Sequence, residues 1–150
     1  IFHLTDFAFS LLIPAGSPHF SMNTLENYAT VNNIVAEVVR CFQGGQPKLL
    51  QHEPIPFDPA SKNFCMAKPT KYDLILEGKK VGGAAQRRTS NGLLHQGTLS
   101  LSPLPPLFLD HILLPNTQVK DAMTANSHFL LKDSSSLEEA RSDLKKYSLK

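Results

Sequence analysis

The sequence predicts a single domain of the α/β or α+β class, and three features of the chain support this. Strand-like and helix-like segments are interspersed along 150 residues, a length that can bury a substantial core. Apolar residues recur at three- and four-residue spacing between Asn23 and Gly44, as in a helix. Short apolar or alternating stretches separated by turn residues occupy 71–102, as in paired strands.

The first two elements are a strand and a long helix. Residues 7–13 read as a mostly buried strand that ends at Pro14. Asn23, with Glu26 three residues on, gives the helix a variant of the capping box. Cys41, near the apolar face, is expected to be an inert core thiol. That face extends over about five turns, through Leu25, Tyr28, Val31, Val35, Val38 and Phe42.

The middle of the chain is predicted to change from loop to sheet. Residues 46–70 contain five prolines, so we expect loop or edge structure with a short strand near Leu49. The segment 71–102 reads as a three-stranded antiparallel meander, whose turns fall at 77–79 and 90–92. Prolines then end the sheet region.

The last third of the chain is predicted to be helical. A short helix is expected over 117–126. Ser136 and Glu139 form a second capping box, which opens a final helix. These elements make 103–150 a helical extension of the preceding sheet region.

Composition excludes some classes of function and leaves others open. A net charge of +2 is too small to indicate a nucleic-acid or membrane partner. The longest apolar run falls short of the ~20 residues of a membrane span. Two cysteines do not make a disulfide framework, which favours a reduced protein of the cytoplasm or an organelle matrix. The histidines lack metal-ligand spacing, so no protein-bound metal is expected. The first residue is Ile1 rather than Met, and we expect that N-terminal sequence is missing.

The unusual stretch is a strand of small residues that begins with a lysine. Lys80 is followed by Val81 and then by two glycines and two alanines. Such a strand sacrifices packing, which makes sense if a ligand lies against its backbone. Lys80 could then direct its ammonium at a phosphate or carboxylate. The next strand repeats the pattern with the polar pair His95 and Gln96 followed by Gly97, and neighbouring strands would place the two polar clusters side by side. The alternative is a tight meander whose glycines ease twist and whose lysines are merely solvated.

These residues resemble the signature of lipoate–protein ligases and the related octanoyltransferases. The most specific match is Gly78–Arg88, in which Lys80 falls on the lysine of the family pattern. Tyr72–Leu74 and Leu94–Leu99 accompany it. Ile1–His3 is similar to the end of the family's Arg-Arg-x-x-Gly-Gly-Gly segment and its following His, although the Arg and Gly residues are absent here.

The resemblance covers roughly residues 1–102 and implies both a fold and an activity. The fold would be the biotin/lipoate ligase catalytic domain, with mixed and antiparallel sheet and flanking helices, akin to class II aminoacyl-tRNA synthetases. Residues 1–150 would be the C-terminal part of one such domain. The activity would be attachment of lipoate or octanoate to a lysine of a lipoyl carrier domain, in a dehydrogenase complex E2 or the glycine cleavage H protein. A ligase would consume ATP with Mg²⁺ to form an acyl-adenylate, with no bound prosthetic group.

The resemblance also implies roles for individual residues. Lys80 would bind the anionic phosphate and offset the oxyanion charge that develops at the acyl carbon. Lys79 would remain a solvated turn residue. The other candidate substrate-binding residues are His3, Gly82, Gly83, Ala84, Gln86, His95 and Gly97.

Cys65 leaves a second mechanism open. In the octanoyltransferase branch, a cysteine in a similar place forms a thioester with the acyl group, since a thiolate is both a strong nucleophile and a good leaving group. Lys80 could lower the pKa of this thiol by proximity, whereas a buried inert thiol is the alternative. Three hypotheses remain: an ATP-dependent lipoate–protein ligase, an ATP-independent octanoyltransferase, and a non-catalytic module of the same fold.

Overall fold

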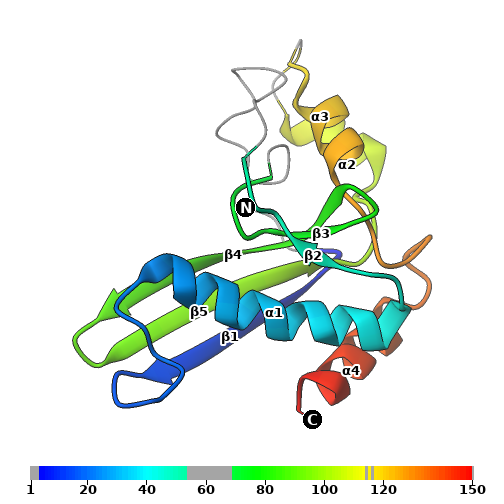
Figure 1. Ribbon diagram of the computed structural model, residues 1–150. Helices are drawn as coiled ribbons and strands as arrows, with labels where there is room; N and C mark the ends of the chain where they lie inside the picture. The colour runs from blue at the N-terminus through cyan, green and yellow to red at the C-terminus, as the bar shows by residue number, and fades with distance from the viewer. Residues whose placement is uncertain (1–3, 54–68, 114, 116, 150) are drawn as a thin grey trace.

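The computed structural model describes residues 4–53, 69–113, 115 and 117–149, which form an antiparallel sheet with flanking helices (Figure 1). The strands lie in the order β1-β5-β4-β3-β2. Their bounds are Asp6–Pro14 for β1, Lys48–Leu49 for β2, Leu74–Leu76 for β3, Lys79–Thr89 for β4 and Gly92–Ser100 for β5. The described helices are α1 (Thr24–Gln43), α2 (Pro106–Ile112), α3 (Val119–Asn126) and α4 (Leu137–Ser148). This is the α/β class expected from the sequence.

Helix α1 runs across one face of the sheet and confirms the predicted long helix (Figure 1). The Asn23 side chain accepts a hydrogen bond from the Leu25 N–H at 3.0 Å. Glu26 binds the Asn23 side-chain amide rather than its backbone, so the capping box is only half formed. The helix ends at Gly44, whose φ of +80° suits a glycine after the last turn. Cys41 is exposed, so the expectation of a buried thiol was wrong.

Strand β1 was correctly predicted, but its burial was not. Among the described strands it is an edge strand that pairs with β5 alone, and only Ile13 within it is buried. Ala8, Ser10 and Leu12 are all exposed, because they alternate onto the sheet face that α1 does not cover. The prediction of a mostly buried strand was therefore wrong.

The meander is confirmed, and a register shift inside it decides which residues share a face. Lys80 lies opposite Ile75 and Gly82 opposite Leu74, so two consecutive residues of β3 face three residues of β4. Val81 is the extra residue of this β-bulge. Because of it, Lys80 shares a face with Gly83 instead of with Gly82.

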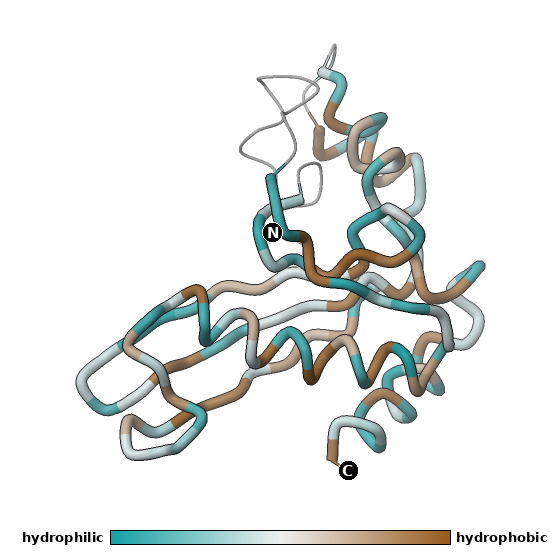
Figure 2. The backbone as a smooth tube through the Cα atoms, viewed as in Figure 1, coloured by the Kyte–Doolittle hydropathy of each residue, from teal (hydrophilic) through white to brown (hydrophobic). Residues whose placement is uncertain are grey.

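The core forms between the sheet and its helices. Its main cluster joins Val39 of α1 and Leu99 of β5 to Leu144 of α4, so the C-terminal helix packs into the same core as the sheet. Figure 2 shows the apolar residues recurring along α1 and in the strands. None of the described helices is long and apolar enough to cross a membrane.

The remaining elements differ from expectation in three details. Helix α2 was not predicted, although Pro106 suits its first turn. Helices α3 and α4 were predicted, but the Ser136 side chain makes no capping hydrogen bond, so the second capping box is absent. A mixed and antiparallel sheet was expected. The named strands pair antiparallel throughout, and the parallel contact is an isolated bridge between Lys80 and Ser127.

Candidate active site

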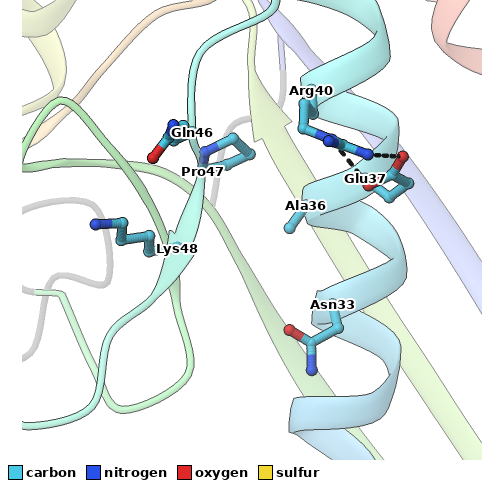
Figure 3. A pocket seen from close by; sticks show the side chains of 7 residues that line it. All are labelled: Asn33, Ala36, Glu37, Arg40, Gln46, Pro47 and Lys48. Carbon is cyan, nitrogen blue, oxygen red and sulfur yellow. Dashed lines mark hydrogen bonds and ion pairs between the residues drawn. The ribbon is translucent and has the colours of Figure 1, made fainter.

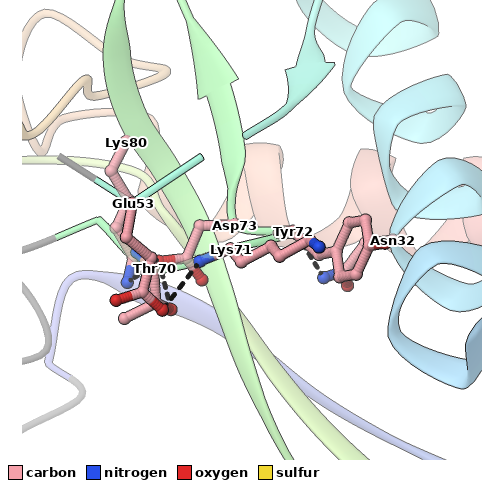
Figure 4. Close-up of polar contacts among 7 residues, drawn as sticks. All are labelled: Asn32, Glu53, Thr70, Lys71, Tyr72, Asp73 and Lys80. Carbon is pink, nitrogen blue, oxygen red and sulfur yellow. Dashed lines mark hydrogen bonds and ion pairs between the residues drawn. The ribbon is translucent and has the colours of Figure 1, made fainter. Parts of the chain in front are cut away.

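Lys80 lies at the start of β4 and is buried, with 5% of its surface exposed. Its ammonium nitrogen Nζ is 2.6 Å from Oδ2 of Asp73, which is also buried (Figure 4). The same oxygen accepts hydrogen bonds from the backbone N–H of Thr70 at 2.6 Å and from its hydroxyl at 3.0 Å. The lysine singled out by the sequence is therefore half of a buried, hydrogen-bonded ion pair rather than a solvated turn residue.

The turn that carries Asp73 is held from two sides. Tyr72 has a φ of +67°, a conformation that non-glycine residues adopt rarely and that needs support from its surroundings. The Asn32 side chain of α1 donates to the Tyr72 carbonyl at 2.8 Å (Figure 4). The Leu50 N–H donates to the Asp73 carbonyl at 2.9 Å, and the Leu50 carbonyl accepts from the Tyr72 N–H at 2.8 Å. Helix α1 and the segment after β2 thus fix the carboxylate that receives Lys80.

Sequence reasoning missed Asp73 as a member of the site. The signal that could have found it is electrostatic, since a buried ammonium needs an opposite charge nearby. Tyr72–Leu74 stood beside the lysine motif in the family resemblance, but no role was assigned to the carboxylate.

At the two glycines after Val81, an added Cβ would point to opposite faces of the sheet. A Cβ at Gly83 would lie 2.8 Å from Nζ of Lys80 and 2.9 Å from Oδ1 of Asp73, so the missing side chain leaves room for the ion pair itself. A Cβ at Gly82 would lie 2.7 Å from Leu99 Cδ2, on the face that α1 covers. Ala84, next to Gly83, pairs with Gly97 on that same covered face.

Gln86 and His95 do come together, as the neighbouring strands predicted, but away from Lys80. Gln86 Nε2 and His95 Nδ1 are 2.8 Å apart on the face beneath α1. His95 is fully buried, with Phe9 stacked on it and Tyr28 of α1 edge-on. The Lys80 ammonium lies on the opposite face from His95, whereas Gln96 shares its face, so the expectation that the two polar clusters lie side by side is confirmed only in part.

Burial has the largest effect on the pKa values of the residues around Gln86 and His95. Desolvation lowers the pKa of His95 from 6.5 to about 4, so its ring is neutral near pH 7. The Nε2 atom of His95 and the Oε1 atom of Gln86 have no hydrogen-bond partner among the described residues. Burial also raises the pKa of Tyr28, partly offset by a backbone hydrogen bond at Gln86. The cluster is therefore neutral at physiological pH.

Gly97 serves packing beneath α1. A Cβ there would lie 2.3 Å from Cζ of Phe9, so the glycine makes room for the ring that covers His95.

Two of the predicted site residues cannot be placed, because His3 and Cys65 lie outside the described residues. Lys79 is exposed, in line with a solvated turn residue.

Two pockets lie near β2, away from the lysine. One has a volume of about 350 Å³, and its Arg40 is held by Glu37, with Nη2 and Oε1 2.5 Å apart (Figure 3). It is lined by Asn33, Ala36, Glu37, Arg40, Gln46, Pro47 and Lys48. The second, of about 410 Å³, lies beside the β3–β4 turn and shares Gln46 and Lys48. Lys80 lines neither of them.

The arrangement around Lys80 has a definite chemical capacity. An ammonium offers three N–H donors and no acceptor, and here the Asp73 carboxylate pairs with it in the space that Gly83 leaves. A fixed donor in a poorly solvated setting interacts strongly with negative charge that develops on a neighbouring oxygen. His95, neutral and beneath α1, is not a proton donor for the same group at neutral pH.

Comparison with known proteins finds relatives among the octanoyltransferases. Octanoyltransferase LipM of Bacillus subtilis (strain 168) is 23% identical over 130 residues, covering 84% of this chain and 46% of its own length. Octanoyltransferase LipM of Oceanobacillus iheyensis is 36% identical over 67 residues, covering 43% of this chain and 24% of its own. The chain thus spans about half the length of the curated relatives that it matches along most of its sequence.

Solved structures share the fold. Lipoate-protein ligase A bound with ATP superposes with a TM-score of 0.50 at 15% identity, covering 98% of this chain and 62% of that one. Protein Ta0514 of T. acidophilum with bound lipoic acid also gives 0.50, at 16% identity, covering 95% and 61%. At such low identity, these likenesses establish the fold alone.

The sequence model of the biotin/lipoate A/B protein ligase family matches residues 1–103, well over half of the chain. The match includes β1 to β5 and the Lys80–Asp73 pair. The chain therefore belongs to the biotin/lipoate A/B protein ligase family.

Proposed function

We propose that this chain is part of an octanoyltransferase, an enzyme that moves an octanoyl group from a carrier thioester to a lysine of a lipoyl carrier protein. The observation that carries the proposal is the buried Lys80 ammonium, held over Gly83 by Asp73. Family membership supports acyl transfer or ligation in general. The names of the relatives favour the transferase over the ATP-dependent lipoate ligase.

The role proposed for Lys80 follows from charge. When a nucleophile attacks an acyl carbon, the carbonyl oxygen becomes an oxyanion. An ammonium held beside that oxygen stabilises the transition state more than the ground state, and one such donor contributes roughly 2.7–4 kcal/mol. Asp73 fixes the ammonium before the substrate arrives, so little reorganisation is needed during the reaction.

We propose that the acyl chain lies along the sheet face next to Lys80. Beyond the ion pair, a row of Gly83, Thr98 and Ala8 crosses β4, β5 and β1. The next two rows are Ala85, Gln96 and Ser10, then Arg87, Leu94 and Leu12. Small side chains lie nearest the ammonium, and Leu12, 72% exposed, lies at the far end. Three rows extend over roughly 14 Å, at ~3.4 Å per residue.

The nucleophile proposed for this reaction is Cys65. The Cys65 thiol gives up its proton, its sulfur attacks the acyl carbon of the donor thioester, and a new C–S bond forms. The C–S bond to the carrier breaks, and the carrier thiolate takes up the proton that Cys65 released. The amine of the acceptor lysine then attacks the acyl-cysteine, the amide C–N bond forms and the bond to Cys65 breaks, and the Cys65 thiolate takes up the proton that the amine loses. Lys80 faces the oxyanion in both steps. The lipoate ligase alternative would instead need ATP and Mg²⁺ as substrates, with lipoate or octanoate as the acid.

The test uses the full-length protein, an octanoyl-carrier thioester and an apo lipoyl domain. We expect octanoyl-amide on the lipoyl domain without ATP, detected by intact mass, and a trapped acyl-enzyme that Cys65→Ser abolishes. Lys80→Met should lower the rate of transfer about 10²–10³-fold. The matched control is Lys79→Met at the exposed neighbouring residue, which should transfer at the wild-type rate.

Three results would contradict this proposal. Release of pyrophosphate from ATP and lipoate that survives Cys65→Ser would favour the ligase. Absence of both acyl-adenylate and acyl-enzyme would favour a non-catalytic module. Normal transfer by Lys80→Met would remove the role of the ammonium under either mechanism.

A further inference from the structure

The backbone of Lys80 is paired on one side by a segment from the C-terminal third of the chain. The β4–β5 ladder covers Gly82 to Thr89 and does not reach Lys80. In its place, Ser127 forms a parallel bridge with Lys80, and the N–H of His128 donates to the Lys80 carbonyl at 2.7 Å. The backbone carbonyl of Lys80 therefore accepts a hydrogen bond from His128, which lies more than forty residues downstream in the sequence.

The same segment, residues 127–131, also forms backbone hydrogen bonds at the end of β5. The N–H groups of Leu130 and Leu131 donate to the carbonyls of Ser100 and Leu101, at 3.0 and 2.8 Å. Both Ser127 and Leu130 are buried. Residues 127–131 therefore pack into the core at Ser127 and Leu130 instead of lying on the surface.

The side chain of His128 contacts the same turn. Its Nδ1 atom lies 3.7 Å from Oε2 of Glu77, which has a φ of +52° in the turn that joins β3 to β4. His128 therefore touches this turn on both sides, at Glu77 through its ring and at Lys80 through its backbone.

We propose that His128 is a positioning residue for Lys80. Its N–H satisfies a carbonyl of a buried residue, and such a carbonyl is costly to leave without a donor. The hydrogen bond fixes the Lys80 peptide, and the peptide directs the ammonium onto Gly83. The family match ends at residue 103, so this assigns part of the site to sequence beyond the matched region. The chemical consequence rests on the proposed function, whereas the positioning itself does not.

The test measures how well Lys80 is protected from an amine-reactive reagent. Acetic anhydride is applied in trace amounts to the folded full-length protein, and Lys80 modification is measured by mass spectrometry against exposed Lys145. His128→Pro removes the N–H, and we expect Lys80 to react about tenfold faster, the factor given by roughly 1.4 kcal/mol. His128→Ala restores the N–H and should restore protection. Leu131→Pro, the matched control, removes an equivalent bond to Leu101 and should leave Lys80 protected.

Equal Lys80 reactivity in the two proline variants would overturn the proposal. If His128→Pro does not fold, amide hydrogen exchange on the wild-type protein decides: slow exchange at His128 supports the bond, and exchange at the rate of an open loop refutes it. Where the wild-type protein transfers octanoate, His128→Pro should lower kcat and leave KM for the carrier unchanged. Labelling and exchange need no activity, so a failure of the proposed function would not be mistaken for a failure of this one.

Discussion

Acidification should destabilise this protein through His95, by an amount that the structure sets. The ring is fully buried beneath α1, and burial lowers its pKa to about 4 from 6.5. A depressed pKa means that the folded state favours the neutral ring. The corresponding stability is complete above pH 6.5 and is lost as the pH falls toward 4, because the unfolded chain takes up a proton that the folded chain refuses.

The expected loss is about 3 kcal/mol between pH 6.5 and pH 4, at 1.36 kcal/mol per pH unit. This is a large part of the stability of an ordinary domain, typically 5–15 kcal/mol. Below about pH 4 the folded state is protonated too, and the contribution of His95 levels off. Phe9 and Tyr28 pack against the ring and offer no charge that would stabilise a cation.

The assay is urea unfolding at pH 7, 6, 5 and 4, on the wild-type protein and on His95→Gln. Carboxylates titrate in both proteins, so the difference between their free energies of unfolding isolates His95. That difference should move by about 3 kcal/mol in favour of the variant as the pH falls. NMR should show the His95 ring titrating near pH 4. A difference that stays constant with pH, or a ring that titrates near 6.5, would refute the assignment of a buried neutral ring.

Two further predictions concern the ion pair and the packing over His95. The double variant Lys80→Met, Asp73→Leu should have a free energy of unfolding within about 1.5 kcal/mol of the wild type while losing acyl transfer. Lys80→Met alone should lower the free energy of unfolding by roughly 3–5 kcal/mol, because it leaves a buried carboxylate unpaired. Urea unfolding and transfer assays check both. Gly97→Ala places a Cβ 2.3 Å from the Phe9 ring and should cost about 1–3 kcal/mol by calorimetry. Gly16→Ala, which meets nothing within 4 Å, is its control.

Much of the fold follows from patterns that act over a few residues. The helix after Asn23 needs only its cap, its apolar spacing and its terminal glycine, all of which lie within the helix or next to it. The meander needs short turns between strand formers. Burial of β1 could not be predicted in the same way, because the apolar residues of 7–13 do not reveal that β1 is an edge strand with one uncovered face.

The site was predictable where it depends on residue type and unpredictable where it depends on register. Lys80 stood out because a lysine before a run of small residues is unusual. The side of the sheet on which Lys80 lies could not be predicted, because one extra residue at Val81 reverses the alternation of side chains and separates Lys80 from His95. Asp73 and His128 reach Lys80 through a turn with positive φ and through a contact between distant segments, and neither leaves a periodic signal in the sequence.

The ion pair is better explained by chemistry than by stability. Burying an ammonium and a carboxylate costs about as much as their attraction returns, so apolar side chains of similar size would serve folding equally well. Yet several local features hold this pair in place. Thr70 donates twice to Asp73, and Gly83 gives up a side chain that would clash with both charges. The pair lies at the head of the sheet face opposite α1, and the proposed function gives its fixed cation a role there, because acyl transfer would develop negative charge beside it.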